Sequence, residues 1–205
     1  PRERALAFSI NGKGYVGLGY NRDEDTEELG DFWEYDPGTN AWKQLSNFGG
    51  TARYNAISFA IGSKGYIGTG YDGDGYNSDF WEYDPATDLW KEIKSYPGEK
   101  IEGGLAMVVN DKAYICAGRN NGLFNTDFWE FDASGSDIVW TNQAPDDDEG
   151  YYDEFKAAVS RYNAMTFTVD NKAYIIGGVE SSGATSKSVY EFDTSTFFWD
   201  DRTAF

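Results

Sequence analysis

The sequence contains no histidine among its 205 residues and only one cysteine, Cys116. Without histidine, the chain cannot build imidazole metal sites, Ser-His triads or the usual general base of neutral pH. One cysteine cannot form an internal disulfide. No apolar run approaches the ~20 residues needed to cross a bilayer, so we predict no transmembrane segment. Residues 1–20 also lack the charged start and apolar block of a signal peptide, so an exported form would have lost its signal.

Basic residues are scarce as well. The chain has 17 Lys and Arg residues and 35 Asp and Glu residues, which gives a formal net charge of −18 at pH 7. A chain with this charge is repelled by nucleic acid and by anionic membranes, so neither is an expected partner. Aromatic residues make up 18% of the chain and there are 24 glycines, a balance typical of a β-rich fold with many turns.

The chain contains four internal repeats. A Lys-Gly-Tyr or Lys-Ala-Tyr triplet begins at residues 13, 64, 112 and 172, with spacings of 51, 48 and 60 residues. A second landmark follows each triplet, and reads Phe-Trp-Glu-Tyr-Asp-Pro in the first two repeats. A third landmark is a tryptophan in each repeat, at Trp42, Trp90, Trp140 and Trp199. Three landmarks in register predict four copies of one supersecondary unit.

Each repeat is predicted to form four short strands. The first strand of each repeat alternates small and large side chains, as in Ala5, Ala7 and Ser9 against Leu6, Phe8 and Ile10. Because its two faces differ in bulk rather than in polarity, we expect both to be buried between neighbouring sheets. We therefore predict an all-β fold of four four-stranded antiparallel sheets packed radially as blades. No helix is expected, and the best candidate, Tyr151 to Val159, lies in a long insertion.

The landmarks resemble the kelch repeat, which has a glycine pair after its second strand, an aromatic residue in the third and a tryptophan seven residues later. The resemblance covers the whole chain, residues 1–205, with blades at about 1–50, 51–100, 101–160 and 161–205. It departs at the glycine pair, because Leu18, Thr69 and Ala117 replace the first glycine. The resemblance implies a β-propeller, similar to bacterial cell-surface, galactose-oxidase-like proteins. Kelch propellers usually have six or seven blades, so three expectations stay open: part of a longer propeller, a four-bladed ring, or closure by a second chain.

Arginine begins three of the four inner strands, and two of these arginines stand in an Arg-Tyr-Asn-Ala motif. Guanidinium groups with Tyr and Asn at a channel mouth suit a carboxylate, a sugar acid or an acidic peptide. The resulting candidate ligand-binding set is Arg2, Arg53, Tyr54, Asn55, Arg119, Arg161, Tyr162 and Asn163. The alternative is structural: each arginine pairs with an Asp of a neighbouring blade or with a backbone carbonyl.

Other loop residues suggest further sites on the same side of the blades. Closely spaced oxygen ligands in one loop could hold calcium, namely Asp72, Asp74, Asn77 and Asp79, with solvated loops as the alternative. The loop aromatics could anchor a glycan or a protein, and they are Tyr20, Tyr71, Tyr76, Tyr96, Phe124, Tyr151 and Tyr152. The acidic insertion at 146–154 is a candidate partner surface.

Two functions follow from the resemblance. The preferred one is a non-catalytic extracellular or cell-surface propeller that binds a protein or glycan, in a cell-envelope complex, through its loop side. The alternative is a sugar-processing kelch enzyme such as a sialic-acid mutarotase, with arginines holding the sugar carboxylate; no general acid or base stands out in the sequence to support it. Copper oxidase chemistry of the galactose oxidase type is not supported, because the chain lacks the His ligands. No cofactor is expected apart from the calcium considered above.

Overall fold

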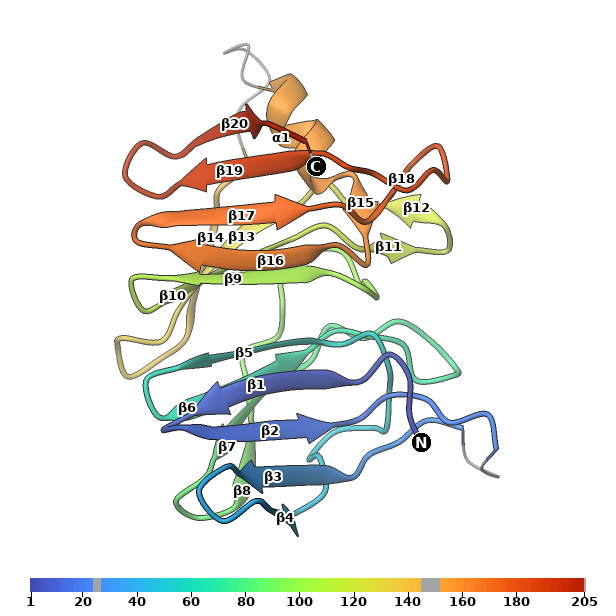
Figure 1. Ribbon diagram of the computed structural model, residues 1–205, viewed down its shortest axis with the longest axis vertical. Coiled ribbons are helices and arrows are strands. Elements are labelled where there is room, and N and C mark those ends of the chain that lie inside the picture. Colours follow the sequence, from blue (N-terminus) through green and yellow to red (C-terminus); the bar gives the residue numbers. More distant parts are fainter. Residues whose placement is uncertain (24–26, 145–151, 205) are drawn as a thin grey trace. The chain divides into compact units, whose positions relative to one another are not determined.

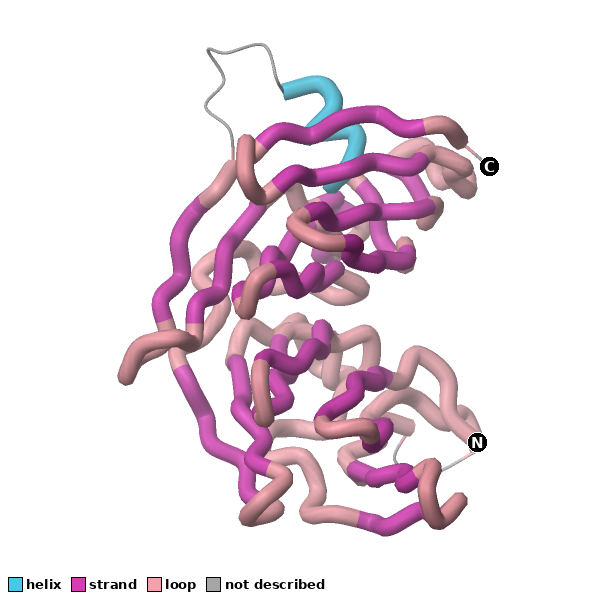
Figure 2. Tube along the Cα trace, turned by 60° about the vertical axis from the view of Figure 1, so that its left-hand side comes forward, coloured by secondary structure: helices cyan, strands magenta, loops and turns pink. Residues whose placement is uncertain are grey.

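The computed structural model describes residues 1–23, 27–144 and 152–204. Strands dominate these residues (Figures 1 and 2). Sixteen of the strands form four antiparallel sheets of four strands each. Two compact units divide the chain: unit 1 is Pro1–Glu102 and unit 2 is Gly103–Phe205. Each unit contains two of the sheets, which we call blades 1 and 2 in unit 1 and blades 3 and 4 in unit 2.

The strands run in chain order from the inner to the outer edge of each blade. Blade 1 contains β1 (Leu6–Ile10), β2 (Lys13–Gly17), β3 (Phe32–Asp36) and β4 (Ala41–Gln44). Blade 2 contains β5 (Ile57–Ile61), β6 (Lys64–Gly68), β7 (Phe80–Asp84) and β8 (Leu89–Ile93). Blade 3 contains β9 (Leu105–Val109), β10 (Lys112–Cys116), β13 (Phe128–Asp132) and β14 (Val139–Asn142). Blade 4 contains β16 (Met165–Val169), β17 (Lys172–Ile176), β19 (Val189–Asp193) and β20 (Phe198–Arg202). The predicted repeats and strands are confirmed.

Unit 1 is held together by an aromatic core between its two blades. Phe32 of β3 lies with its ring centroid 5.1 Å from those of both Tyr83 and Trp90. Phe8 of β1 lies against Gly65 so closely that a Cβ at Gly65 would stand 2.4 Å from the Phe8 ring. Any larger residue at position 65 would therefore separate the two blades. The large side chains of β1 thus pack against a small residue in the second strand of the next blade.

Unit 2 repeats this packing and adds a helix. Phe128 of β13 lies 4.9 Å from the Phe192 ring and 5.4 Å from the Trp199 ring, centroid to centroid. The expectation of no helix is wrong, because Tyr152–Val159 forms the helix α1. Phe155, Ala158 and Val159 are buried in the core of unit 2. Their spacing places all three on one side of a helix, which explains why α1 forms.

Four two-residue strands lie at one end of unit 2, at the right of Figure 1: β11 (Arg119–Asn120), β12 (Leu123–Phe124), β15 (Arg161–Tyr162) and β18 (Val179–Glu180). In unit 1, isolated bridges occupy the equivalent places, including Tyr54 with Tyr71. The β15–β18 pair and the Tyr54–Tyr71 bridge join the loop before an inner strand to the loop after the second strand, whereas β11 and β12 pair within the latter loop. Within each unit, the loops before the inner strands and the loops after the second strands therefore lie at the same end of the blades. We call this end the loop side.

The two faces of the inner strands are not equally buried. The large residues of β9 are buried, as expected, but those of β16 are exposed: Met165 by 74%, Phe167 by 44% and Val169 by 50%. In β1 the small residues Ala7 and Ser9 are exposed. The expectation that every inner strand is buried on both faces is therefore wrong for β1 and β16.

Candidate ligand-binding site on the loop side

Two of the predicted arginines bind an aspartate of their own blade. Arg2 donates to both carboxylate oxygens of Asp31, at 2.8 and 2.6 Å, and Arg53 donates to both oxygens of Asp79, at 2.6 and 3.0 Å. Each aspartate also accepts a bond from the indole of the tryptophan two residues later. Arg53 is 1% exposed and donates further to the carbonyls of Thr51 and Thr69. These contacts match the structural alternative, except that the aspartate lies in the same blade rather than in a neighbour.

Arg161 is equally buried, although its blade has no aspartate at this place. Ser188 stands at the position of Asp31 and Asp79. Arg161 donates instead to the carbonyls of Gly177 and Ala157, both at 2.6 Å, and lies over the Tyr190 ring. Burial lowers the pKa of its guanidinium. Within the described residues the guanidiniums of Arg53 and Arg161 are thus engaged by the fold, and they do not reach toward the loop surface.

The residue two positions after each of these arginines, and after Ile101 in the third repeat, has a left-handed backbone. Its φ is 56° at Arg4, 52° at Asn55, 63° at Gly103 and 53° at Asn163. Asn and Gly tolerate this conformation, whereas other residues adopt it at a cost of about 1 kcal/mol. Arg4 is the exception in the set. A strained residue that persists in a repeat is a candidate for function rather than for folding.

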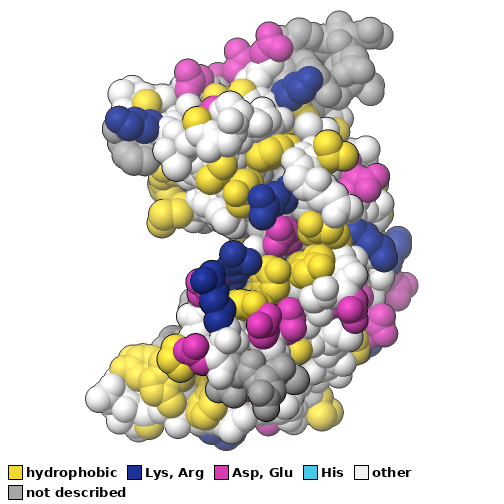
Figure 3. Space-filling view, turned by 90° about the vertical axis from the view of Figure 1, so that its right-hand side faces the viewer, with side chains coloured by type: hydrophobic (Ala, Val, Ile, Leu, Met, Phe, Trp, Pro, Cys, Tyr) yellow, Lys and Arg dark blue, Asp and Glu magenta, His cyan; other side chains and the backbone are white. Residues whose placement is uncertain are grey.

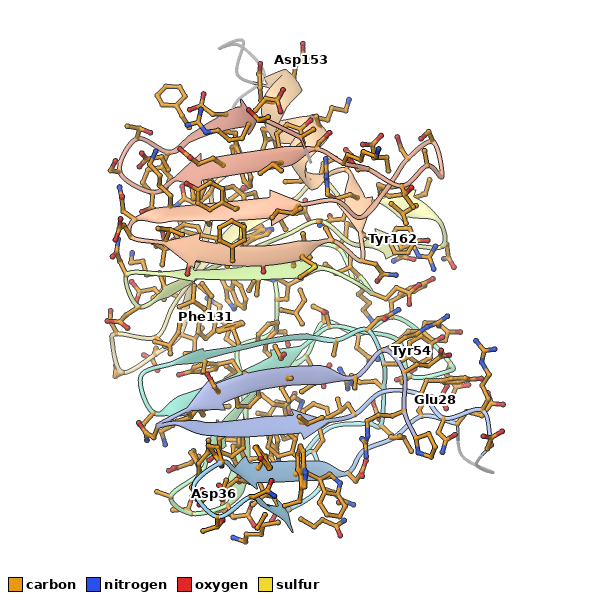
Figure 4. The ribbon with its side chains drawn as sticks, in the orientation of Figure 1. Glu28, Asp36, Tyr54, Phe131, Asp153 and Tyr162 are labelled. Atoms are coloured by element: carbon orange, nitrogen blue, oxygen red, sulfur yellow. The ribbon has the colours of Figure 1, made fainter. Side chains whose placement is uncertain are left out.

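Arg4 begins a row of aromatic rings on the loop side of unit 1. Its guanidinium carbon lies 5.1 Å from the centre of the Tyr54 ring, and the Arg4 side chain is exposed. Tyr54 contacts Tyr20 at 5.3 Å and Tyr71 at 5.6 Å, and Tyr71 contacts Tyr76 at 5.0 Å, all between ring centroids. Figure 4 places Tyr54 at the end of unit 1 opposite Asp36. We call Arg4, Tyr20, Tyr54, Tyr71 and Tyr76 the tyrosine row.

The tyrosine row is held in place by loop glycines and by pairing between loops. Gly70 has a φ of 93°, and a Cβ there would stand 2.8 Å from the carbonyl oxygen of Tyr54. Tyr54 and Tyr71 exchange two backbone hydrogen bonds of 3.0 Å. A cavity of about 280 Å³, lined by residues 1–3 and 20–23, lies beside Tyr20. Backbone hydrogen bonds therefore hold Tyr54 and Tyr71 in place, and the Tyr20 end of the row borders the cavity.

A buried carboxylate lies behind the tyrosine row. Glu102 is 6% exposed and accepts a hydrogen bond of 2.9 Å from the side-chain amide of Asn55. Burial raises the pKa of the Tyr54 hydroxyl, and the nearby charge of Glu102 adds to the effect. The Tyr54 hydroxyl keeps its proton, as a tyrosine does at neutral pH, and can donate a hydrogen bond to a ligand. The site thus combines four kinds of polar group: the guanidinium of Arg4, the phenol of Tyr54, the amide of Asn55 and the carboxylate of Glu102.

Unit 2 carries a smaller group of the same kind on its own loop side. The guanidinium carbon of Arg119 lies 4.0 Å from the centre of the Tyr162 ring, and the Phe124 ring lies 5.9 Å from Tyr162. Asn163 turns its side-chain oxygen toward Gly103, so closely that a Cβ at Gly103 would stand 3.1 Å from it. Figure 4 shows Tyr162 at the opposite end of unit 2 from Phe131. The structure thus brings Arg119 and Tyr162 together, as the predicted set requires.

The predicted calcium ligands have partners within the protein, and Asp72 also accepts a side-chain hydrogen bond from Asn77. Asp79 is bound by Arg53 and by the Trp81 indole, and Asp72 accepts bonds from the backbone of Asp74 and Gly75 and from Thr51. Within residues 1–23, 27–144 and 152–204, no group of three or more acidic, His or Cys side chains could hold a metal ion. Asp79 instead belongs to the arginine lattice, because its position recurs as Asp31 in blade 1.

The other predicted site residues are loop aromatics and the acidic insertion. Tyr96 is 3% exposed and belongs to the interior rather than to a loop surface. Tyr151 and the acidic residues at 146–149 lie outside the described residues. No described helix has the length and apolar character needed to cross a membrane.

Arg4 and Glu102 were not among the residues predicted from the sequence. A signal for Arg4 is present, because the other three repeats have Asn55, Gly103 and Asn163 at the equivalent position.

Figure 3 shows basic, acidic and apolar side chains on the loop side of the units. Comparison with known proteins places the repeats in a family. A family model described as the KLHDC2/KLHL20/DRC7 Kelch-repeats domain matches residues 1–150. The chain belongs to the kelch-repeat family. This kelch chain is also similar to a solved structure titled "Structure of YjhT", with a TM-score of 0.78 and 16% identity, over 100% of this chain and 71% of that one. The expected kelch-type β-propeller fold is confirmed.

Two curated relatives of this kelch chain are named N-acetylneuraminate epimerase. The protein from Yersinia enterocolitica is 44% identical over 50 residues, which are 22% of this chain and 13% of the relative. The protein from Shigella boydii is 30% identical over 79 residues, which are 38% of this chain and 22% of the relative. The matched segments therefore span less than a quarter of either relative.

Proposed function

We propose that the tyrosine row of unit 1 binds a carboxylate-bearing sugar of the N-acetylneuraminate class. The observation that carries the proposal is Arg4. Its side chain is exposed, it occupies a strained backbone position and it lies over the Tyr54 ring. Among the described residues Arg4 forms no ion pair, whereas Arg2 and Arg53 each bind an aspartate. Arg4 therefore keeps its donors available for a ligand.

Each part of the site suits one part of such a sugar. The planar guanidinium of Arg4 can donate two parallel hydrogen bonds to the sugar carboxylate. The rings of Tyr20, Tyr54 and Tyr71 offer apolar surface to the carbon face of the pyranose. The Tyr54 hydroxyl can donate to one of the sugar hydroxyl groups, whereas the hydroxyls of Tyr20 and Tyr71 already donate to Glu27 and to the carbonyl of Gly73. The names of the two relatives support this ligand class, since both include N-acetylneuraminate.

The binding test compares two sugars that differ only at the carboxyl group, which is charged in the acid and uncharged in its methyl ester. Calorimetric titration of the full chain with N-acetylneuraminate should give measurable heat, and its methyl ester should bind roughly 10- to 100-fold more weakly, as expected for a lost charged hydrogen bond. Tyr54→Phe tests the phenol donor, and Leu123→Ala, on an exposed loop residue of unit 2, is the matched control. Equal affinity for the acid and the ester would contradict a carboxylate site.

Glu102 favours a second function, catalysis of sugar anomer interconversion. Ring opening of such a sugar needs a group that moves a proton, and Glu102 is a buried carboxylate fixed by Asn55 beside Tyr54. The sequence analysis found no such group. The test is the rate of α-to-β exchange of N-acetylneuraminate, followed by NMR, for the wild type and Glu102→Gln. A rate no faster than the uncatalysed one for the wild type would restrict the role to binding.

The proposal extends to the location of the protein and to its partner. We expect a protein of the cell surface or extracellular space, with a protein or glycan partner on the loop side. A partner that competes with free N-acetylneuraminate for binding would locate it at the tyrosine row. Binding of a partner that the free sugar does not displace would assign it to another surface.

A further inference from the structure

A second carboxylate, that of Glu28, lies on the loop side of unit 1 beside the tyrosine row. Glu28 comes after the second strand of blade 1, and its backbone forms an isolated antiparallel bridge with Tyr20. The equivalent bridge in blade 2 joins Tyr71 and Tyr76, and Phe124 stands at the same place in blade 3. Blade 1 therefore holds a carboxylate where the next two blades hold an aromatic ring.

The backbone around Glu28 is fixed by hydrogen bonds within its loop. The amide of Asn21 donates to the carbonyl of Glu27 at 2.7 Å, and the amide of Leu29 donates to the carbonyl of Gly19 at 2.9 Å. Glu28 stands between these two bonds and is half-buried. Its side chain therefore starts from a defined place at the edge of the row.

The Glu28 side chain reaches the loop of the next blade in unit 1. A Cβ at Gly73 would stand 2.9 Å from one carboxylate oxygen of Glu28 and 3.4 Å from the other, so the carboxylate lies directly against this glycine. The Gly73 carbonyl also accepts the hydrogen bond of 2.7 Å that the Tyr71 hydroxyl donates. Figure 4 labels Glu28 and Tyr54 at the same end of unit 1. The lack of a side chain at Gly73 thus leaves the space in which the Glu28 carboxylate lies.

The Glu28 carboxylate is close enough to the row to act on its hydroxyl groups. Burial is the main cause of the raised pKa of Tyr54, and the charges of Glu102 and Glu28 add to it. The hydrogen bond to Glu27 is the main cause of the raised pKa of Tyr20, and the charge of Glu28 adds to this effect as well. With the residues that the structure describes, the Glu28 carboxylate itself forms no hydrogen bond or ion pair. A half-buried carboxylate without such a partner gains most from a donor on a ligand.

We propose that Glu28 is a specificity-determining residue of the tyrosine row, which accepts a hydrogen bond from the nitrogen substituent of the bound sugar. This inference rests on the proposed function. Arg4 and Glu28 give the row one group of each charge, and both lie near Tyr54. N-acetylneuraminate carries its carboxylate on the anomeric carbon and its nitrogen on the opposite carbon of the ring. A carboxylate can only accept hydrogen bonds, and an amide N–H or an ammonium group can only donate them, so the row favours a sugar acid with an N–H donor opposite its carboxylate.

The first test uses the sign of the change in affinity. Calorimetric titration of N-acetylneuraminate into Glu28→Gln should show roughly 10-fold weaker binding than in the wild type, because the charged acceptor is lost. Since the ligand is an anion, removing a negative charge that does not touch it would instead strengthen binding. Asp74→Asn is the matched control: it removes the same charge from an exposed residue of the neighbouring loop and should leave the affinity equal or slightly higher. Unchanged or tighter binding by Glu28→Gln would overturn the proposal.

The second test assigns the ligand group that Glu28 contacts. The methyl glycoside of neuraminate has a free ammonium group, whereas the methyl glycoside of N-acetylneuraminate has an amide. The wild type should bind the ammonium form roughly 10-fold more tightly, because its hydrogen bond to Glu28 joins opposite charges, and Glu28→Gln should not distinguish the two glycosides. Equal affinity of the wild type for both glycosides, or the same preference in both chains, would overturn the contact.

Gly73→Ala tests the position of the carboxylate without changing its charge. The added Cβ displaces the Glu28 carboxylate, so N-acetylneuraminate should bind several-fold more weakly and the preference for the ammonium glycoside should fall. Gly75→Ala is the control, because a Cβ there meets nothing within 4 Å, and circular dichroism verifies that both variants fold. If the wild type does not bind N-acetylneuraminate, the proposed function fails together with this inference. Binding that is indifferent to Glu28→Gln and to Gly73→Ala overturns this inference alone.

Discussion

Arg161 donates a hydrogen bond of 2.6 Å to the carbonyl oxygen of Ala157, in the last turn of α1. In blades 1 and 2 the equivalent arginines bind an aspartate instead. The free carbonyls at a helix C-terminus carry partial negative charge and stabilise a nearby cation. The long insertion that precedes the fourth repeat thus provides a backbone carbonyl as the acceptor for Arg161, in place of the aspartate that blades 1 and 2 provide.

If α1 is part of the core of unit 2, then removing its main apolar contact must destabilise that unit. Phe155 is 1% exposed and lies 5.8 Å from Phe128 between ring centroids. We predict that Phe155→Ala lowers the free energy of unfolding by about 3–5 kcal/mol, as is usual for large core aromatics. Asp153→Asn, on the exposed side of the same helix, should change it by less than about 0.5 kcal/mol. Equal denaturant midpoints for the two variants would show that α1 is not packed as described.

Thr69 offers the opposite prediction, a stabilising substitution. It stands where the fourth repeat has the first glycine of its pair, with a φ of 60°, and its buried hydroxyl has no hydrogen-bond partner. Thr69→Gly removes a strained β-branched residue and an unsatisfied polar group. We expect Thr69→Gly to raise the free energy of unfolding, measured in urea, by about 1 kcal/mol. Ala117→Gly, which removes the strain alone, should gain less, and a loss of stability for Thr69→Gly would contradict the explanation.

The sequence predicted the parts of this fold that depend on side-chain alternation and on repeated landmarks. Strand positions such as Phe32–Asp36 and Phe80–Asp84 follow from the pattern alone. The helix was missed because its apolar residues, Phe155, Ala158 and Val159, span only a little more than one turn and follow an acidic run. The sequence also could not show which arginines the fold engages. Arg53 and Arg4 differ in burial and partners, and these depend on the distant residues Asp79 and Tyr54.

Glu191 gives a prediction about acid stability. It is 5% exposed, and hydrogen bonds from Arg202, above all, lower its pKa from 4.5 to about 2. Because its pKa is depressed in the folded state, its contribution is fully present above about pH 4.5 and is lost as the pH falls toward 2. Arg202→Gln should therefore move the midpoint of acid unfolding to higher pH. Asp201→Asn is the control on the same strand, and identical midpoints for the wild type and Arg202→Gln would refute the assignment.

Cys116 should be chemically silent in the folded protein. The thiol is fully buried, and burial raises its pKa to about 12. Since the thiolate is the reactive form, a disulfide reagent at pH 8 should modify no thiol in the native chain and one per chain in denaturant. Rapid modification without denaturant would mean that the core of unit 2 opens readily.

The most direct test of the ligand site is calorimetric titration of N-acetylneuraminate into the wild type and Arg4→Asn. Asparagine is the residue that two other repeats place at this left-handed position, at Asn55 and Asn163, so the variant should fold and gain up to about 1 kcal/mol of stability. We predict that the wild type binds and that Arg4→Asn binds roughly 10- to 100-fold more weakly. Equal affinity of the two chains, or no binding by the wild type, would contradict the site.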